Sequence, residues 1–387
     1  MSFLNSLLRA TNFRSPLLRT LVPSVGAAFA IQAAFAVPSI LAQSERFYDL
    51  SGSLTHLTVI ALSLYLPALR ARAAGGAPLQ LPSLLEPFTN PSGAALNWRQ
   101  VALSGAAAIW TIRLGSYLFQ RITQQGSDSR FDEIKKSPPK FFAAWMAQAT
   151  WVSLVLMPVV ALNSVPAAAL ASAGALVGLT DALGLGLYAG GLGFEVVADR
   201  QKSRWMAEKK AKQHDEEFMT RGLWSTSQFP NYFGESTLWT GIATLAAGAL
   251  ASKPAQAALG FGGLGGRLGV AALAAVSPLF TTFLLLKVSG VPLSEKKYDK
   301  RYGDRKDYQQ WKKNTPRLVP ELEQFRALCK GHVVLGLMLK LLNADVWDFL
   351  DLSGLVYRQG VDTGFDNHED MRTNKTVKIA PMSLLRA

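Results

Sequence analysis

The sequence has very little cysteine and few charged side chains. Its single cysteine, Cys329, excludes a disulfide within the chain and any metal site built from several thiolates. The four histidines lack the paired spacing of zinc enzymes and are scattered along the chain, at His56, His214, His332 and His368. Lys, Arg, Asp and Glu make up 17% of the 387 residues, below the roughly one quarter of soluble domains. We therefore predict no metal site and no ordinary soluble domain.

Apolar runs fill most of the chain. Hydrophobic residues account for 49% of the sequence and the mean hydropathy is +0.16. A helix needs about 20 mostly apolar residues to cross a bilayer. Runs that meet this rule lie at 21–43, 50–69, 99–119, 141–162, 174–198, 235–252 and 268–290. The sequence thus predicts an all-α polytopic membrane bundle of about seven transmembrane helices, in contact with membrane lipids.

The net charge of +13 comes largely from three segments between or after these runs, at 120–140, 199–221 and 296–317. Short basic loops of this kind favour the cytosolic face or an equivalent compartment. They suit lipid headgroups or a cofactor phosphate, so we predict no nucleic-acid partner. With seven spans, the N-terminus lies on the opposite face.

Four segments differ in composition. Residues 1–20 contain Arg9, Arg14 and Arg19, and no acidic residue precedes Glu45. This is the composition of a mitochondrial targeting sequence or of a basic flank to the first span. Residues 21–320 form the predicted membrane domain, in which the Gly- and Ala-rich stretch 253–269 is expected to be a flexible outer loop. An amphipathic helical extension is predicted at 321–352 and a disordered tail at 353–387.

Arg113, Tyr117 and Arg121 recur every four residues, on one helical face. An arginine within an apolar run is costly and usually faces the bundle interior or a partner. It can also extend along the helix to reach the interface, with Tyr117 as an interfacial anchor.

Glu195 and Asp199 are spaced one helical turn apart and lead into Lys202 and Arg204. Two carboxylates at this spacing repel unless a donor separates them. Ribose hydroxyls or a nicotinamide amide would supply such donors. Ion pairs with Lys202 and neighbouring bases are the alternative.

The segment 222–235 crowds aromatic, amide and carboxylate groups between a basic and an apolar run. If a helix begins near Pro230, Asn231, Glu235 and Trp239 share one face. Tyr232 lies beside them in sequence. A carboxylate at a membrane boundary needs a partner, so this stretch predicts a ligand site. A capped membrane helix with an aromatic belt is the simpler interpretation.

These residues resemble a known family: the membrane reductases related to the C-terminal half of steroid 5α-reductase, in particular the branch that carries the DUF1295 domain. The matching motifs occur in order across about 45–320, most of the chain. They are Phe47-Tyr-Asp-Leu-Ser-Gly-Ser-Leu54, Arg113-Leu-Gly-Ser-Tyr-Leu118 with Asp128-Ser-Arg130, Phe194-Glu-x3-Asp199-x-Gln-Lys202, Gly222-Leu-Trp224, Pro230-Asn-Tyr-Phe-Gly-Glu235, and Val288-Ser-Gly-Val-Pro292 followed by Leu318-Val-Pro320.

The resemblance implies a seven-helix bundle that takes NADPH from the cytosol and reduces an activated C=C bond of a lipophilic, steroid- or lipid-like substrate. By position it implies cofactor binding by Glu195, Asp199, Asn231 and Glu235. Tyr232 belongs to the same motif as Asn231, and Lys202 and Arg204 are the bases expected to bind the 2′-phosphate. Arg113 and Tyr117 are the expected catalytic residues, Arg113 for an oxyanion and Tyr117 for the proton. The endoplasmic reticulum is the expected membrane, with a mitochondrial membrane as the alternative.

Two positions depart from the family pattern. Gln228-Phe229 stands where relatives usually carry Arg-His before the Pro-Asn-Tyr motif, and Trp110 stands where steroid reductases place the proton-donating tyrosine. Two other functions therefore stay open. One is an S-adenosylmethionine-dependent enzyme like the isoprenylcysteine carboxyl methyltransferases. The other is a non-catalytic membrane protein with a degenerate site.

Overall fold

The computed structural model describes residue 6 and residues 8–75, 80–91, 93–174 and 177–321. Within these ranges the chain forms helices and no strands, which confirms the all-α prediction. The long helices are α2 (Pro16–Leu41), α3 (Tyr48–Ala74), α5 (Trp98–Gln125), α6 (Pro138–Val155), α9 (Leu179–Lys210), α10 (Pro230–Leu250), α12 (Gly263–Phe283) and α13 (Val291–Tyr302). Shorter elements are α4 (Glu86–Thr89), η1 (Ser129–Phe131), α7 (Met157–Asn163), α8 (Ala167–Ser172), η2 (Gly222–Ser225), α11 (Lys253–Leu259), the π-helical turn η3 (Leu284–Val288) and α14 (Lys306–Asn314). The predicted extension and tail beyond Glu321 lie outside the described residues.

Helix starts and ends follow local chemistry. At the start of α5, the Asn97 side chain accepts the amide N–H of Arg99 at 3.0 Å, and the Gln100 side chain accepts that of Asn97 at 2.9 Å. This reciprocal cap satisfies donors that the first helical turn leaves free. Gly126 ends the same helix with φ +77°, a conformation that favours glycine. Pro230 begins α10, where its missing N–H is not needed.

Four of the described helices are long and apolar enough to cross a membrane: α2, α3, α5 and the continuous stretch Gly263–Tyr302. A fifth span is formed if α6 and α7, bent by 53° at their junction, count as one. This is the composition of an integral membrane protein. The predicted runs at 174–198 and 235–252 form α9 and α10, which carry the site carboxylates and are not among these spans.

One local prediction is wrong. Residues 253–269 were expected to form a flexible outer loop, but they form α11 and the first turns of α12. Ala255 and Leu259 of this stretch are buried, whereas Gly262 and Gly265 are exposed with open space around them, and Gly260 reverses the chain with φ +74°. The small residues here thus belong to two helices joined by a tight turn.

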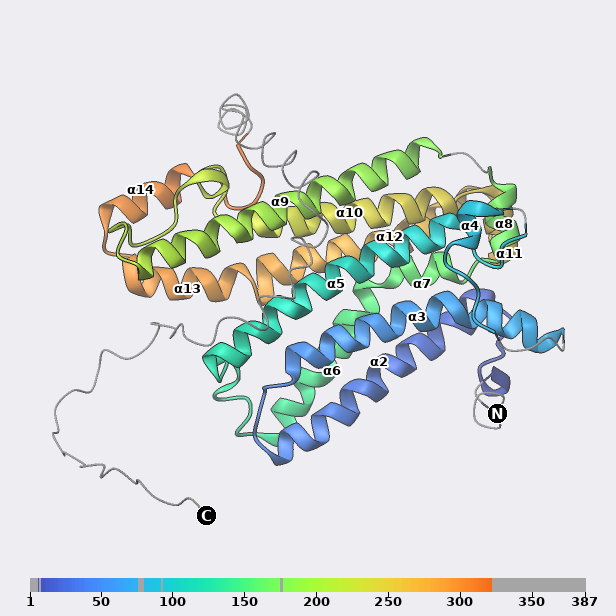
Figure 1. Ribbon diagram of the computed structural model, residues 1–387, viewed down its shortest axis with the longest axis horizontal. Coiled ribbons are helices and arrows are strands. Elements are labelled where there is room, and N and C mark those ends of the chain that lie inside the picture. Colours follow the sequence, from blue (N-terminus) through green and yellow to red (C-terminus); the bar gives the residue numbers. More distant parts are fainter. Residues whose placement is uncertain (1–5, 7, 76–79, 92, 175–176, 322–387) are drawn as a thin grey trace, which may run out of the picture.

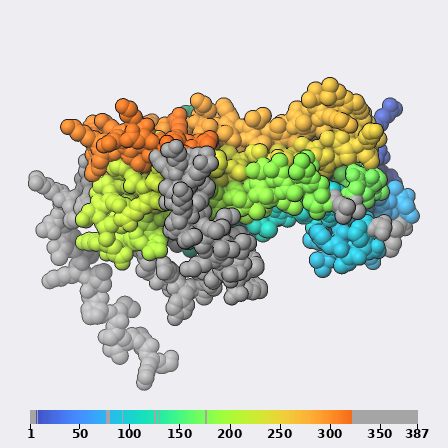
Figure 2. Space-filling model, turned by 90° about the horizontal axis from the view of Figure 1, so that it is seen from above, coloured from blue at the N-terminus to red at the C-terminus, as the bar shows by residue number. Residues whose placement is uncertain are grey.

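The helices lie in two layers (Figure 1). Helices α9, α10 and α12 form one layer, α2, α3 and α6 form the other, and α5 and α7 lie between them. The three basic segments gather at one end of the bundle, on the left in Figure 1. Figure 2 shows α13, α14 and the segment around 200–225 packed together at that end. The start of α2 lies at the opposite end (Figure 1).

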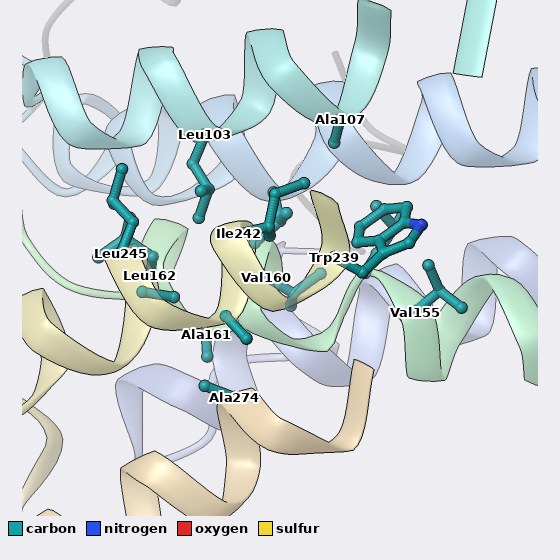
Figure 3. Packing of buried hydrophobic residues seen from close by; sticks show 14 of the residues in the cluster. Leu103, Ala107, Val155, Val160, Ala161, Leu162, Trp239, Ile242, Leu245 and Ala274 are labelled. Carbon is teal, nitrogen blue, oxygen red and sulfur yellow. The ribbon is translucent and has the colours of Figure 1, made fainter. Parts of the chain in front are cut away.

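The main core fills the space between the layers. Side chains of α5, α7, α10 and α12 converge around Trp239, which is fully buried (Figure 3). Trp239 stands edge-on to Trp110 of α5, with ring centroids 5.0 Å apart. Burial of such large side chains provides most of the stabilisation of this region.

Glycines bring α9 and α10 into close contact. A Cβ atom on Gly191 would lie 2.5 Å from the backbone nitrogen of Leu238, and one on Gly234 would lie 2.6 Å from that of Glu195. Any larger side chain would therefore push the helices apart. This close approach places Glu195 of α9 next to the first turns of α10, where Asn231 and Glu235 lie.

Candidate functional site

Arg113 bridges two carboxylates of a neighbouring helix. Its Nη1 lies 2.5 Å from Oε1 of Glu195, and its Nη2 lies 2.5 Å from Oδ2 of Asp199. The arginine side chain is 18% exposed, and the side chains of Glu195 and Asp199 are 5% and 31% exposed. The guanidinium is thus the donor that separates the two carboxylates. The prediction that Arg113 faces an interior partner is confirmed, and Lys202 is not the main partner of the acidic pair.

Several acceptors in the same place lack a donor. The second oxygen of Glu195 and the Oδ1 atom of Asn231 are buried without a hydrogen-bond partner among the described residues. Asn231 lies beside Asp199, and Glu235 faces both Glu195 and Asp199. No described donor reaches the Glu235 carboxylate either. Buried acceptors without donors are uncommon in folded proteins, so this group of atoms is suited to a donor-rich ligand.

Three carboxylates lie here, and Arg113 is the cation that forms ion pairs with two of them. Glu195, Asp199 and Glu235 carry three formal negative charges, and Arg113 carries one positive charge. Such an excess is costly in a partly desolvated place. A ligand that brings N–H or O–H donors, or a positive charge, would relieve it.

Trp110 forms the inner wall of the site. It is 1% exposed and lies against the Glu195 carboxylate, although its indole N–H does not meet hydrogen-bond geometry with it or with another described residue. Trp110 is therefore a packed core residue.

A cavity of about 210 Å³ opens beside the ion pairs, between α5 and α9. Arg113, Leu114 and Tyr117 line one side, and Val196, Asp199, Arg200 and Ser203 line the other. Tyr117 is half exposed, and its hydroxyl has no hydrogen-bond partner among the described residues. The predicted catalytic pair Arg113 and Tyr117 therefore shares one cavity with Asp199.

Of the other predicted cofactor residues, Lys202 and Tyr232 lie near the site and Arg204 does not. Lys202 lies 4.5 Å from the ring centroid of Trp224 and close to Asp199. Tyr232 stacks on Phe229 at 5.5 Å near the start of α10. Arg204, by contrast, points outward: its Nε binds Glu208 at 2.8 Å and its side chain is 84% exposed. The structure does not bring Arg204 into the site, because it is directed to the outer face of α9.

Gln228 has a structural role in this chain. Its side-chain nitrogen donates to the carbonyl oxygens of Lys312 at 2.9 Å and Thr315 at 2.6 Å, and its backbone N–H donates to Pro316. The residue therefore fastens the end of α14 to the start of α10. Gln228 is thus a neutral connector between these two elements.

A second ionic cluster lies at the same end of the bundle. Arg130 binds Asp128 at 2.5 Å, and Arg121 approaches both Asp128 and Asp49. Burial raises the pKa of Asp128, but hydrogen bonds and charge from Arg130 outweigh it and hold the pKa below its usual range. This cluster fixes the loop after α5 to the start of α3.

Sequence reasoning missed Arg200, Ser203 and Leu114 as cavity residues. Ser203 follows Asp199 at a spacing of four, so helical periodicity could have identified it. The pairing of Arg113 with residues more than 80 positions away had no such local signal.

A known protein family matches the part of the chain that carries this site. A family model described as "Protein of unknown function (DUF1295)" matches residues 73–315, more than half of the chain. The match contains Arg113, Glu195, Asp199, Asn231 and Glu235. No curated protein and no solved structure matches the chain.

Proposed function

The chain belongs to the DUF1295 family, and from the site that this match covers we propose that it is a membrane reductase. It uses NADPH to reduce a C=C bond of a lipophilic substrate. The observation that carries the proposal is the group of acceptors without donors around the Arg113 bridge.

The acceptors fit one part of the cofactor. A nicotinamide carboxamide offers two N–H donors and a ribose offers hydroxyl donors, which complement Asn231, Glu235 and Asp199. The pyrophosphate and 2′-phosphate need positive partners, which Arg200 in the lining of the cavity and Lys202 close to Asp199 provide. When bound, NADPH supplies the hydride.

Residues of the protein position the reacting groups and supply the proton. Arg113 is a positioning residue: it holds Glu195 and Asp199 in place and retains further N–H groups that can face a developing oxyanion. Tyr117 is the proton donor, since its hydroxyl lines the same cavity and has no described partner. Leu114 and Val196 form apolar walls of the cavity.

The membrane arrangement is part of the proposal. We infer that α9 and α10 complete a seven-helix bundle of the steroid 5α-reductase type, in which the glycine-mediated contact shields their polar groups from lipid. The basic end faces the cytosol, from which NADPH enters. The endoplasmic reticulum is the proposed membrane, and a mitochondrial membrane is the alternative.

A second candidate is favoured by the charge of the site. An excess of carboxylates over guanidinium also suits the sulfonium cation of S-adenosylmethionine. Phe229, which stands where the related methyltransferases need a histidine, opposes this alternative and also supports a degenerate, non-catalytic site.

Ligand binding to the purified full chain separates these functions. We expect NADPH to quench tryptophan fluorescence saturably, and Asp199→Asn and Asn231→Leu each to weaken binding about tenfold, as loss of one good hydrogen bond to a charged or buried group implies. Arg204→Ala, on the outer face of α9, is the matched control and keeps the parent affinity. Binding of S-adenosylmethionine in place of NADPH would support the methyltransferase. Binding of neither by folded protein would favour a non-catalytic role.

A further inference from the structure

A second, smaller cavity lies deeper in the bundle, between α3, α5 and α6. Its volume is about 40 Å³, room for one hydroxyl-sized group or water. His56, Gln148, Trp110 and Trp151 line it, together with Leu114, which also lines the larger cavity. Leu114 is therefore the wall that the two cavities share.

His56 offers an acceptor to this cavity. The residue is 1% exposed, and its Nδ1 lies 3.0 Å from the carbonyl oxygen of Gly52. A carbonyl oxygen can only accept, so Nδ1 carries the proton. In the neutral ring Nε2 is then a lone-pair acceptor. That atom is buried and has no partner among the described residues.

Gln148 offers a donor. Its Oε1 lies 3.5 Å from the Ser51 hydroxyl, whose hydrogen goes to the Tyr48 carbonyl oxygen at 2.7 Å, and its amide nitrogen lies on the other side. That nitrogen fills the space a Cβ atom at Gly52 would occupy, 2.3 Å from the ideal Cβ position. It donates to no described residue.

Asp49, Ser53 and Thr111 also line the cavity, but each already has a partner: Asp49 pairs with Arg121, and the two hydroxyls donate to carbonyl oxygens of their own helices. The remaining walls are apolar and aromatic. The His56 ring stands edge-on to Trp151 at 4.5 Å and to Trp110 at 5.9 Å. An acceptor and a donor within such walls complement a hydroxyl group, which donates to Nε2 and accepts from the amide. A methyl or an ether oxygen would leave the imidazole acceptor unpaired.

We propose that this cavity binds the hydroxyl end of a lipophilic alcohol, with His56 and Gln148 as its hydrogen-bond partners. The body of the ligand extends past Leu114 into the larger cavity beside Tyr117. The binding site stands on its own geometry, and of its two hydrogen-bonding residues His56 lies outside and Gln148 inside the residues matched by the family model; that its ligand is the substrate rests on the proposed function.

Photolabelling of the full chain in phosphatidylcholine nanodiscs tests the proposal. The probe is a twelve-carbon primary alcohol with a diazirine beside the hydroxyl-bearing carbon, and its methyl ether is the matched control compound. We expect the alcohol to label peptides of α3, α5 and α6 about five- to tenfold more than the ether, the effect of one hydrogen bond. His56→Phe, which fills the cavity, and Gln148→Leu should each abolish this preference.

Thr58→Val, on the exposed face of α3, is the control variant and should keep the preference. If His56→Phe does not fold, Gln148→Leu and His56→Gln give the same comparison. Equal labelling by alcohol and ether, or a preference unchanged by the cavity variants, would overturn the proposal and leave the cavity to water. Alcohol-selective labelling without NADPH binding would overturn only the proposed function, and NADPH binding without alcohol selectivity only this inference.

Discussion

Arg113 and Glu195 are separated by 82 positions in the chain, the same separation as Arg99 and Asp181. Between them, the hydroxyl of Tyr188 donates to the carbonyl oxygen of Ala106 at 2.8 Å, again with a separation of 82. The parallel helices α5 and α9 thus keep one register over roughly four turns. The site is therefore aligned by a polar seam that begins at the opposite end of the bundle.

Replacing Arg113 should destabilise the protein strongly. Arg113→Leu leaves Glu195 and Asp199 facing each other without a cation, and loss of one partner of a buried ion pair costs about 3–5 kcal/mol. Arg113→Lys should recover only part of this, since an ammonium cannot bridge both carboxylates with fork geometry. Thermal unfolding of the purified protein measures the effect.

The control for this prediction is Arg204→Ala, which removes an exposed ion pair of the same helix end. Its effect should stay within about 0.5 kcal/mol. Equal stability of Arg113→Leu and Arg204→Ala would show that the buried bridge does not hold α5 to α9.

The contact between α9 and α10 predicts a contrast between two glycines on one helix. Gly191→Ala places a methyl 2.5 Å from the backbone of Leu238, and overpacking of this kind costs about 1–3 kcal/mol. Gly193 has nothing within 4 Å of its ideal Cβ position. Gly193→Ala should therefore leave stability unchanged or raise it by up to about 1 kcal/mol. Unfolding midpoints of the two variants decide; a milder effect at Gly191 than at Gly193 would contradict the close packing.

At the far end of the seam between α5 and α9, two substitutions of Asp181 should lower stability by different amounts. Asp181 binds Arg99 at 2.8 Å and also accepts the backbone N–H of Gly178, which caps α9. Asp181→Asn removes the charge but keeps an acceptor for the cap, whereas Asp181→Ala removes both. We expect Asp181→Ala to be less stable than Asp181→Asn by about 1 kcal/mol, the usual value of a cap. Equal melting temperatures would mean that the cap contributes nothing.

Acid should loosen the loop after α5. Because the pKa of folded Asp128 is lowered, its contribution to stability is present above the unfolded pKa of about 4. It is lost as the pH falls through the lower folded value. Asp128→Asn should thus lower the melting temperature at pH 7 and have little effect near pH 3. A variant effect that grows on acidification would show the opposite sign of the shift.

Sequence patterns predicted much of the fold because each apolar run carries its own helix signal. Pro230 and the four-residue spacing placed Asn231 and Glu235 correctly on one face at the start of α10. Patterns could not predict that Arg113 separates Glu195 from Asp199, since that contact depends on how two distant helices pack. Arg204 was assigned to the cofactor from its place in a basic run, but its direction is set by rotation of α9 about its axis. The prediction for 253–269 was wrong because glycine and alanine occur both in loops and at helix starts and turns.

The hydrogen bonds of Gln228 connect the basic end of the bundle to the candidate site. Its side chain holds Lys312 and Thr315 two residues before α10 begins, and the continuous stretch Gly263–Tyr302 joins that end to the membrane core. The segment after the last described span is therefore hydrogen-bonded to the residues that lead into the first turn of α10, which carries Asn231. A partner protein or a bound lipid headgroup that displaced α14 would therefore also displace that turn. The position of Asn231 in the site therefore depends on the position of α14.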